Sequence, residues 1–208
     1  LCGCIGIMAL SFVWSPPVIW FGVALAALMI FTIFSTRALL IGALSVVLTL
    51  CVLAVPVAFP AHLIYSPYQL LECIGNDTTK LMEIRAAGLY HQRVFDLGFA
   101  NANRKTDENV KRTADYYEFP YTLQDDLGSV AVVGSGAGND VAAARRMGAK
   151  SVDAIEIEPA ILQLGEYYHP EKPYSDARVT AIVNDARTFL RNTPNKYDMI
   201  VYGLLDSH

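Results

Sequence analysis

Three glycines with the spacing of a ligand-binding turn lie in the stretch Val132–Ala149, VVGSGAGNDVAAARRMGA. Gly134, Gly136 and Gly138 follow an apolar run typical of a strand and precede a helical pattern. Glycine permits positive φ and lets the backbone approach a ligand closely. We therefore expect this turn to bind a cofactor.

Three carboxylates follow the strands predicted after this turn. Glu156 ends the second strand, where it can accept hydrogen bonds from both ribose hydroxyls, and Asp185 follows the third, where it can accept from an adenine amino group. Asp206 follows the fourth strand at the mouth of the same crevice. Each acid alone is also typical of a solvated loop or a helix cap. Their succession at strand ends, where doubly wound sheets bind ligands, indicates a nucleoside site.

The glycine spacing distinguishes between nucleosides. The dinucleotide fingerprint is G-x-G-x-x-G/A, and Asn139 stands at its last position here. The observed G-x-G-x-G favours a sulfonium cofactor such as S-adenosylmethionine. That cofactor has no pyrophosphate and requires no anion site at a helix N-terminus.

An alternation of strands and helices positions these residues. Strands are predicted over 129–134, 151–158, 177–183 and 197–203, and helices over 139–148, 159–168 and 185–192. Strands separated by helices imply βαβ units and a parallel sheet. Nearly continuous apolar strands indicate burial on both faces of that sheet. We expect an incomplete α/β nucleoside-binding domain over residues 128–208, with its first four strands present.

The preceding residues, 62–127, are expected to form a small β-hairpin domain. The segments Tyr68–Gly75 and Thr78–Ile84 flank GND, a favourable hairpin turn. The rest is expected to comprise a further strand, a polar loop and a helix limited in length by Pro120, at residues 85–95, 101–111 and 114–124.

Residues 1–61 have the composition of a membrane segment. Their only charged residue is Arg37, which separates the uncharged runs Pro17–Phe34 and Ala38–Phe59. A spanning helix needs about 20 mostly apolar residues. We therefore predict transmembrane helices here and a lipid bilayer as partner. A buried hairpin of a soluble protein and a signal peptide are less consistent with two adjacent runs of this length.

Charge and cysteine usage exclude other classes. The net charge of the chain is −4, and without Arg37 it is −5, with no basic stripe to suggest a nucleic-acid partner. The four cysteines and four histidines lack metal-ligand spacing, so no metal is expected.

The ends of the chain and its orientation give two further expectations. The chain starts at Leu1 and stops at His208 within the predicted sheet, so we expect a fragment of a multi-pass membrane protein. Sulfonium nucleosides are cytosolic, which favours a cytoplasmic soluble domain. Arg37 in the short connecting loop favours the opposite orientation.

From about Ser66 to Asp206 the sequence resembles the spermidine/spermine synthase (polyamine aminopropyltransferase) family. SPYQLLE is similar to the S-x-Y-Q opening strand of the family, YYEF to its Y-H-E-M segment and VVGSGAGN to its V-I-G-G-G-D-G-G loop. AIEIEPAILQLGEYY is similar to V-E-I-D-P-x-V-I-x-x-A-x-x-Y, the most specific stretch. Residues 176–206 resemble the remaining motif, which ends in D-x-x-D.

The resemblance implies a small β-domain followed by a methyltransferase-like Rossmann domain. It also implies transfer of an aminopropyl group from decarboxylated S-adenosylmethionine to a small amine. A homodimer is a separate expectation. By this resemblance the three glycines line the cofactor, Glu156 holds the ribose and Asp185 the adenine, and Gln69 contacts cofactor or substrate. The final stretch resembles membrane-anchored members.

The chain departs from the family at the acids. The loop aspartate of the family falls at Ala137, its catalytic aspartate at Gly203 and the histidine of Y-H-E-M at Tyr117. A carboxylate is needed to hold the cationic amine and help remove its proton. Asp206, the second acid of D-x-x-D, is therefore the predicted catalytic residue, with possible substitutes at Glu118, Asp125, Asp126 and Tyr117.

The same departures open other functions. The family aspartate would repel the carboxylate of S-adenosylmethionine, so Ala137 predicts that this parent cofactor is accepted. An S-adenosylmethionine-dependent methyltransferase on the same fold is one alternative. A non-catalytic membrane sensor of a nucleoside or polyamine, favoured by the lost acids, is the other.

Overall fold

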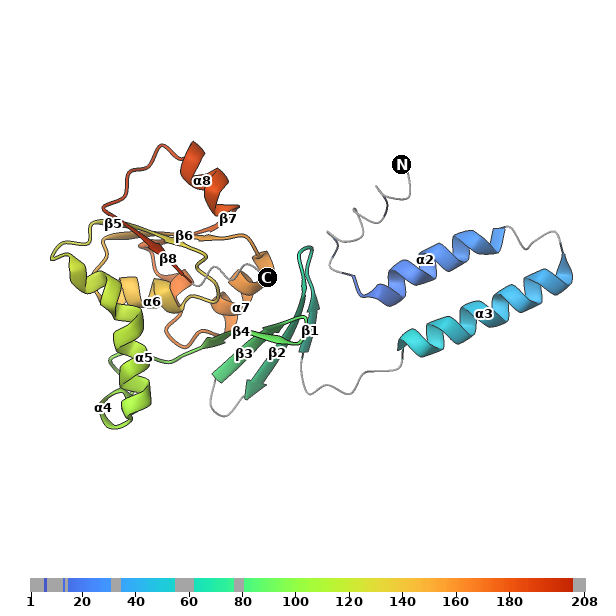
Figure 1. Cartoon of the computed structure of the whole chain (residues 1–208), viewed down its shortest axis with the longest axis horizontal. Coiled ribbons are helices and arrows are strands. Elements are labelled where there is room, and N and C mark those ends of the chain that lie inside the picture. Colours follow the sequence, from blue (N-terminus) through green and yellow to red (C-terminus); the bar gives the residue numbers. More distant parts are fainter. Residues whose placement is uncertain are drawn as a thin grey trace. The chain divides into compact units, whose positions relative to one another are not determined.

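The computed structural model describes residues 6, 13, 15–30, 35–54, 62–76 and 81–203 of the chain (Figure 1). The chain divides into two compact units, Leu1–Glu72 and Cys73–His208.

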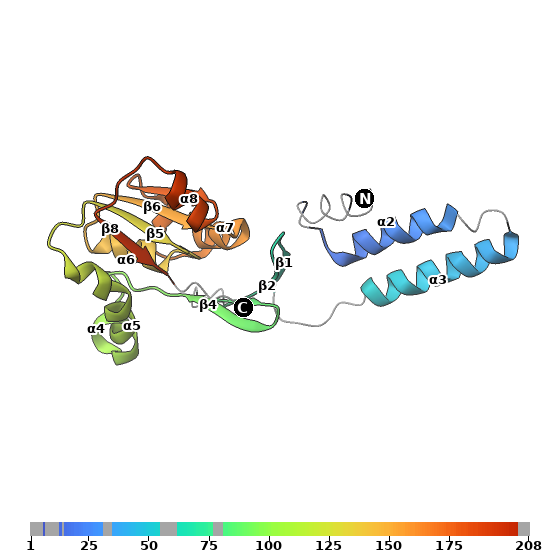
Figure 2. The same ribbon diagram turned by 45° about the horizontal axis from the view of Figure 1, so that its top comes forward.

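Two helices occupy the apolar part of the first unit. Helix α2 (Pro17–Met29) and helix α3 (Thr36–Ala54) lie side by side (Figures 1 and 2). Helix α2 has 13 residues. At 1.5 Å per residue it is about 20 Å long, shorter than the roughly 30 Å hydrocarbon layer. In the described part of the chain, no helix combines the length and the apolar character needed to cross a membrane. The predicted transmembrane helices are thus not confirmed.

A small sheet follows the helices. Its strands are ordered as in the sequence: β1 (His62–Tyr65), β2 (Leu70–Asn76), β3 (Leu81–Ala86) and β4 (Leu89–Val94). Strands β3 and β4 pair antiparallel through a turn at Ala87 and Gly88, which have φ of 49° and 82°. The strands predicted in this region are confirmed, while the predicted GND turn includes residues outside the described ranges.

Helices replace the loop predicted over Asn101–Lys111. The segment contains α4 (Asn103–Thr106) and the start of α5 (Glu108–Glu118), after which η2 (Phe119–Leu123) continues as a 3₁₀ turn. Asp107 caps α5, because its side chain accepts a hydrogen bond from the Asn109 N–H at 2.8 Å. The loop prediction was wrong because a mostly polar segment shows no apolar helical period. Its helices are held by a cap and ion pairs as well as by apolar contacts.

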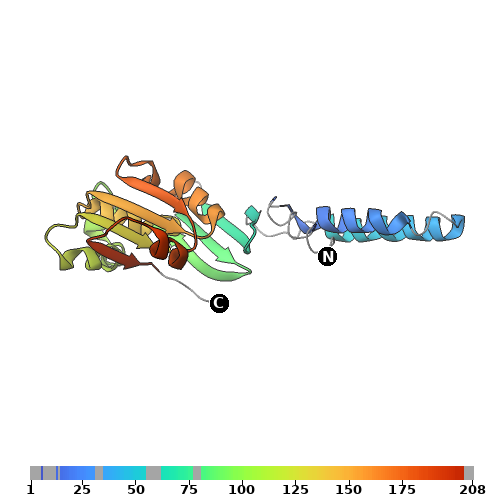
Figure 3. The same ribbon diagram turned by 90° about the horizontal axis from the view of Figure 1, so that it is seen from above.

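The second unit contains the predicted parallel sheet. Its strands, in the order β7-β6-β5-β8, are all parallel (Figures 1 and 3). Helices α6 and α7 cover one face and α8 the other, which makes the sheet doubly wound (Figure 2). The elements are β5 (Ser129–Val133), α6 (Asn139–Arg146), β6 (Ser151–Glu156), α7 (Pro159–Tyr168), η3 (Pro173–Ser175), β7 (Val179–Val183), α8 (Ala186–Asn192) and β8 (Met199–Tyr202). This confirms the α/β prediction.

Strand β5 forms the centre of the core. Val130 and Val132 pack in the cluster that includes α6, whereas Ala131 and Val133 pack in the cluster that includes α8. Continuous burial therefore holds for this strand, but Val183 of β7 and other residues of the outer strands are exposed.

The strand order reverses between β5 and β8. At this point α6 leaves the end of β5 toward one face, while β8 arrives from the helix on the other face. The crevice at the carboxyl ends of two such strands is where doubly wound sheets bind ligands. The glycine turn directly follows β5 and therefore lies at this position.

Candidate functional site

The glycine loop requires glycine at all three predicted positions. Gly134, Gly136 and Gly138 have φ of 70°, 55° and 102°, a region that side chains disfavour. Space is also limited: a Cβ on Gly136 would lie 2.6 Å from Oε1 of Gln92, and one on Gly138 would lie 2.7 Å from Cγ of Pro173. The loop backbone therefore passes closer to its neighbours than any other residue would allow.

Glu156 is joined to this loop. Its Oε2 accepts a hydrogen bond from the Gly136 N–H at 2.8 Å, and its Oε1 accepts one from the Glu158 N–H at 2.9 Å. The residue is 8% exposed. A carboxylate has about four acceptor sites, so two remain for the hydroxyls of a ligand. The structure thus brings together the loop and the acid that the sequence assigned to the ribose.

Ala137 is packed between β4 and α7 and does not line the cavity described below. It is fully buried, and its N–H donates to Oε1 of Gln92 at 3.1 Å. A Cβ on Gly165 of α7 would lie 2.4 Å from the Ala137 carbonyl oxygen, so glycine there permits the close approach. Sequence reasoning missed Gln92, because one polar residue in a strand carries no recognisable pattern.

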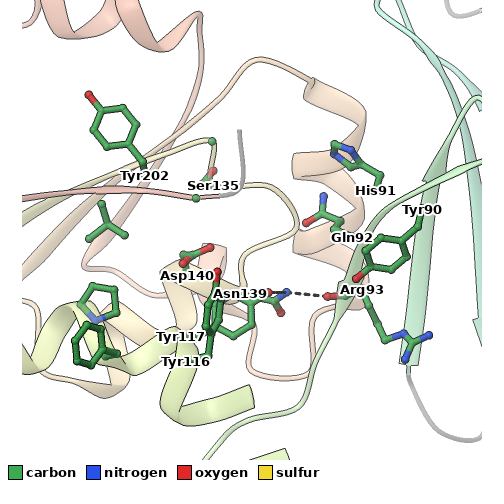
Figure 4. A pocket seen from close by; sticks show the side chains of 15 residues that line it. Tyr90, His91, Gln92, Arg93, Tyr116, Tyr117, Ser135, Asn139, Asp140 and Tyr202 are labelled. Atoms are coloured by element: carbon green, nitrogen blue, oxygen red, sulfur yellow. Dashed lines mark hydrogen bonds between the residues drawn. The ribbon is translucent and has the colours of Figure 1, made fainter. Parts of the chain in front are cut away.

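A cavity of about 420 Å³ opens beside the loop (Figure 4). Gly134 and Ser135 form part of its wall, so the cavity and the glycine loop share a border. Its other walls come from β4, α5, η2, the start of α6 and the end of β8. Five aromatic side chains contribute, namely Tyr90, Tyr116, Tyr117, Phe119 and Tyr202.

Asp140 is the carboxylate of this cavity and was not singled out from the sequence. It lies in the first turn of α6, where an acid is usually explained by the helix dipole. Burial raises its pKa to about 6, although its own backbone N–H lowers it. The hydroxyl of Tyr121 donates to the Asp140 carbonyl at 3.1 Å and fixes the backbone there.

Asn139 connects the cavity walls. Its Nδ2 donates to the Arg93 carbonyl at 2.7 Å and to the Tyr117 hydroxyl at 3.2 Å, while its Oδ1 accepts from the Phe95 N–H at 3.1 Å. Asn139, which departs from the dinucleotide fingerprint, therefore joins β4 to α6. Burial raises the pKa of Tyr117 to about 12, so its hydroxyl is neutral at pH 7.

The spermine/spermidine synthase domain is the family whose sequence model matches the chain, over residues 114–208. That range includes the glycine loop, Glu156, Asp140 and the whole parallel sheet. Over residues 114–208 the chain is similar to the spermine/spermidine synthase domain family.

Solved spermidine synthases are similar to this chain in fold. One, in complex with the transition-state analogue AdoDATO, is 14% identical with a TM-score of 0.51, and the match covers 69% of this chain and 46% of that one. The enzyme from Thermotoga maritima is 15% identical with a TM-score of 0.50, over 67% and 45% of the two chains. A probable spermidine synthase from Corynebacterium glutamicum is 18% identical with a TM-score of 0.51, over 71% and 53%.

These likenesses are likenesses of fold, because the identities are low. The chain spans about half the length of these solved structures. No curated protein sequence matches it significantly.

Asp185 caps α8. Its Oδ1 accepts from the Thr188 N–H at 2.7 Å, and this hydrogen bond lowers the pKa of the carboxyl. The neighbouring Asn184 N–H donates to the Glu156 carbonyl at 3.0 Å, so Asp185 follows β7 next to the end of β6. Its role toward adenine stays a prediction.

Two other predicted residues are not among the described residues that line the cavity. Gln69 lies in the first unit, in a turn closed by the Ser66 N–H, which donates to the Gln69 carbonyl at 3.1 Å. Asp206, the predicted catalytic acid, lies outside the described residues. The roles of both stay predictions.

The substitute acids have other partners or positions. Glu118 is paired with Arg104 at 2.5 Å and Arg146 at 2.8 Å, and the exposed Asp126 is paired with Lys150 at 2.6 Å. Neither acid lines the cavity, and neither does the exposed Asp125. Of the suggested substitutes, only Tyr117 faces the cavity.

Proposed function

We propose that this chain binds a sulfonium nucleoside and transfers an aminopropyl-type group from it to an amine. The observation that carries the proposal is the Glu156 carboxylate, hydrogen-bonded to the glycine loop at the carboxyl end of a parallel sheet and next to an aromatic cavity. The match to the spermine/spermidine synthase domain supports the same reaction class.

The glycine loop and Glu156 are suited to bind the nucleoside part of the sulfonium cofactor. Two acceptor sites of the carboxylate are free for ribose hydroxyls, and the glycines leave room for a ligand to approach the backbone. The solved relative in complex with AdoDATO supports a cofactor related to decarboxylated S-adenosylmethionine. When bound, such a cofactor supplies a carbon activated by positively charged sulfur.

The cavity is suited to bind the amine substrate. Aromatic faces attract ammonium groups, and five aromatic side chains line this cavity. Gly134 and Ser135 belong to the glycine loop and also line the cavity, so an amine in the cavity would lie next to a nucleoside bound at the loop.

Binding and transfer can be tested on the intact chain. We expect calorimetry to show binding of S-adenosylmethionine and of its decarboxylated form, but none of NAD, since the loop lacks the dinucleotide spacing. Incubation with putrescine and labelled decarboxylated cofactor is expected to give an amine heavier by one aminopropyl group.

Each other result selects another function. Transfer of a methyl group from S-adenosylmethionine would indicate a methyltransferase, and binding without turnover would indicate a sensor. A strong preference for the decarboxylated cofactor would contradict the prediction made from Ala137. Absence of binding of either sulfonium cofactor would refute the proposal.

Attachment to a lipid bilayer stays a prediction of the sequence. Leu44 and Leu48 of α3 are 70% and 65% exposed, and exposed apolar surface marks membrane or protein contacts. If the bilayer covers them, the variant L44D/L48D is expected to leave liposomes in a flotation assay, because each charge costs about 2.5–3.5 kcal/mol in hydrocarbon. L123D, at an equally exposed leucine outside residues 1–61, is the control. Equal flotation of both variants would contradict attachment through α3.

A further inference from the structure

The cavity has one carboxylate among its described lining residues, Asp140. In Figure 4 its side chain lies between Tyr117 on one side and Ser135 and Tyr202 on the other. A lone carboxylate surrounded by aromatic rings is a site for a cation, because the charge and the ring faces attract the same ligand.

The charge of Asp140 is not compensated within the described part of the chain. There, no other residue donates a hydrogen bond to its carboxylate or forms an ion pair with it. Burial raises the pKa of Asp140 to about 6, although the hydrogen bond from its own backbone N–H lowers it. A half-buried carboxylate that no other residue pairs with costs stability, and such a cost is typical of groups that meet a ligand.

Residue 203, where the family has its catalytic aspartate, is a glycine here, and the carboxylate of the cavity comes from Asp140 of α6 instead. A Cβ on Gly203 would lie 2.5 Å from the Gly134 carbonyl oxygen, so the residue that follows β8 cannot carry a side chain unless the backbone moves. The same Cβ would lie 3.4 Å from Oδ2 of Asp140. The Asp140 carboxylate therefore reaches the cavity wall at which a side chain of residue 203 would start.

We propose that Asp140 binds the ammonium group of the amine substrate and accepts its proton before transfer. The ammonium loses one proton to the Asp140 carboxylate, and the neutral amine then attacks the carbon bonded to sulfur. The new C–N bond forms as the C–S bond breaks, and the bonding electron pair leaves with sulfur as a neutral thioether. The product is a secondary ammonium, and the proton on Asp140 passes to solvent.

This inference rests on the proposed function, and the variant D140N tests it in the intact chain. We expect the dissociation constant for putrescine, measured by calorimetry with the nucleoside bound, to rise about 10- to 100-fold because the charge is lost. The transfer rate is expected to fall about 10²- to 10⁴-fold. Affinity for the nucleoside should change by less than about twofold, since the glycine loop and Glu156 are untouched.

Two further variants show whether the effect belongs to the charge at this position. D140E keeps the charge and is expected to retain most of the putrescine affinity, while D115N removes an exposed acid of α5 outside the cavity and should change nothing. The thermal midpoint of D140N without ligands is expected to equal or exceed that of the wild type, because an uncompensated charge is removed.

The two proposals fail in different ways. If wild-type protein binds no sulfonium nucleoside, the proposed function is wrong. If the nucleoside binds but D140N keeps the wild-type putrescine affinity, or if the wild type binds no putrescine, the role of Asp140 is refuted while the nucleoside site stands.

Discussion

E156A is expected to lose nucleoside binding by about 100-fold or more. The wild-type carboxylate has two acceptor sites free for the ribose, and each charge-assisted hydrogen bond contributes about 1.5–3 kcal/mol. Alanine also leaves the N–H groups of Gly136 and Glu158 without their partner, so the loop loses its anchor. Calorimetry with S-adenosylmethionine and its decarboxylated form measures the loss.

Two variants separate binding from folding. E156Q keeps the size of the side chain, but its NH₂ group must face one of two N–H donors, so it is expected to bind nearly as weakly as E156A. E166A makes the same change on the exposed side of α7 and should bind like wild type. A folded E156A protein, as judged by circular dichroism, with unchanged affinity would remove the ribose assignment.

E118A is expected to lower the free energy of unfolding by about 3–5 kcal/mol, because it leaves buried charge without a partner. Its carboxylate pairs with Arg104 and Arg146, whose side chains are 15% and 7% exposed. Arg146 retains its second partner, Glu171, at 2.5 Å, whereas the ion pair between Arg104 and Glu118 is lost entirely. Urea denaturation followed by circular dichroism measures the change.

The control for this prediction is an exposed ion pair. D126A breaks the pair of Asp126 with Lys150, whose side chains are 69% and 68% exposed. Exposed pairs contribute about 0–1 kcal/mol, so this variant should unfold close to wild type. Similar losses of unfolding free energy in E118A and D126A would show that burial of the Glu118 ion pairs adds nothing to their contribution to stability.

The pH dependence gives a second readout for Glu118. Burial raises its pKa, but hydrogen bonds from Arg104 and Arg146 outweigh burial and leave the pKa below its usual value of 4.5. A lowered pKa means that the contribution to stability is present above about pH 4.5 and declines as the pH falls through the value in the folded protein. E118A should lack this part of the acid destabilisation. If the free energy of unfolding falls in parallel with pH for the wild type and for E118A, this prediction is wrong.

Periodicity alone predicted the parallel sheet. From β5 to β8 each strand and helix appears where the sequence placed it, with ends shifted by a few residues. The reason is local: buried strands are continuous apolar runs, and glycine or proline marks the ends of several neighbouring helices.

The helical segment before the sheet was predicted less well. The residues from Asn103 to Lys111 are mostly polar and were assigned to a loop, yet they form α4 and the start of α5. Arg104, in that segment, bonds to Glu118 fourteen residues away. Ion pairs of this kind do not produce an apolar period, so sequence reasoning had no signal for them.

The sequence by itself determined the glycine loop and the acid at the end of β6. Those residues act through backbone conformation and strand ends, which short motifs encode directly. Only the tertiary structure decided which residues meet at the cavity, because Gln92, Asp140 and Gly203 come from elements far apart in the chain. In the structure Ala137 is buried between β4 and α7, whereas Asp140 faces the cavity.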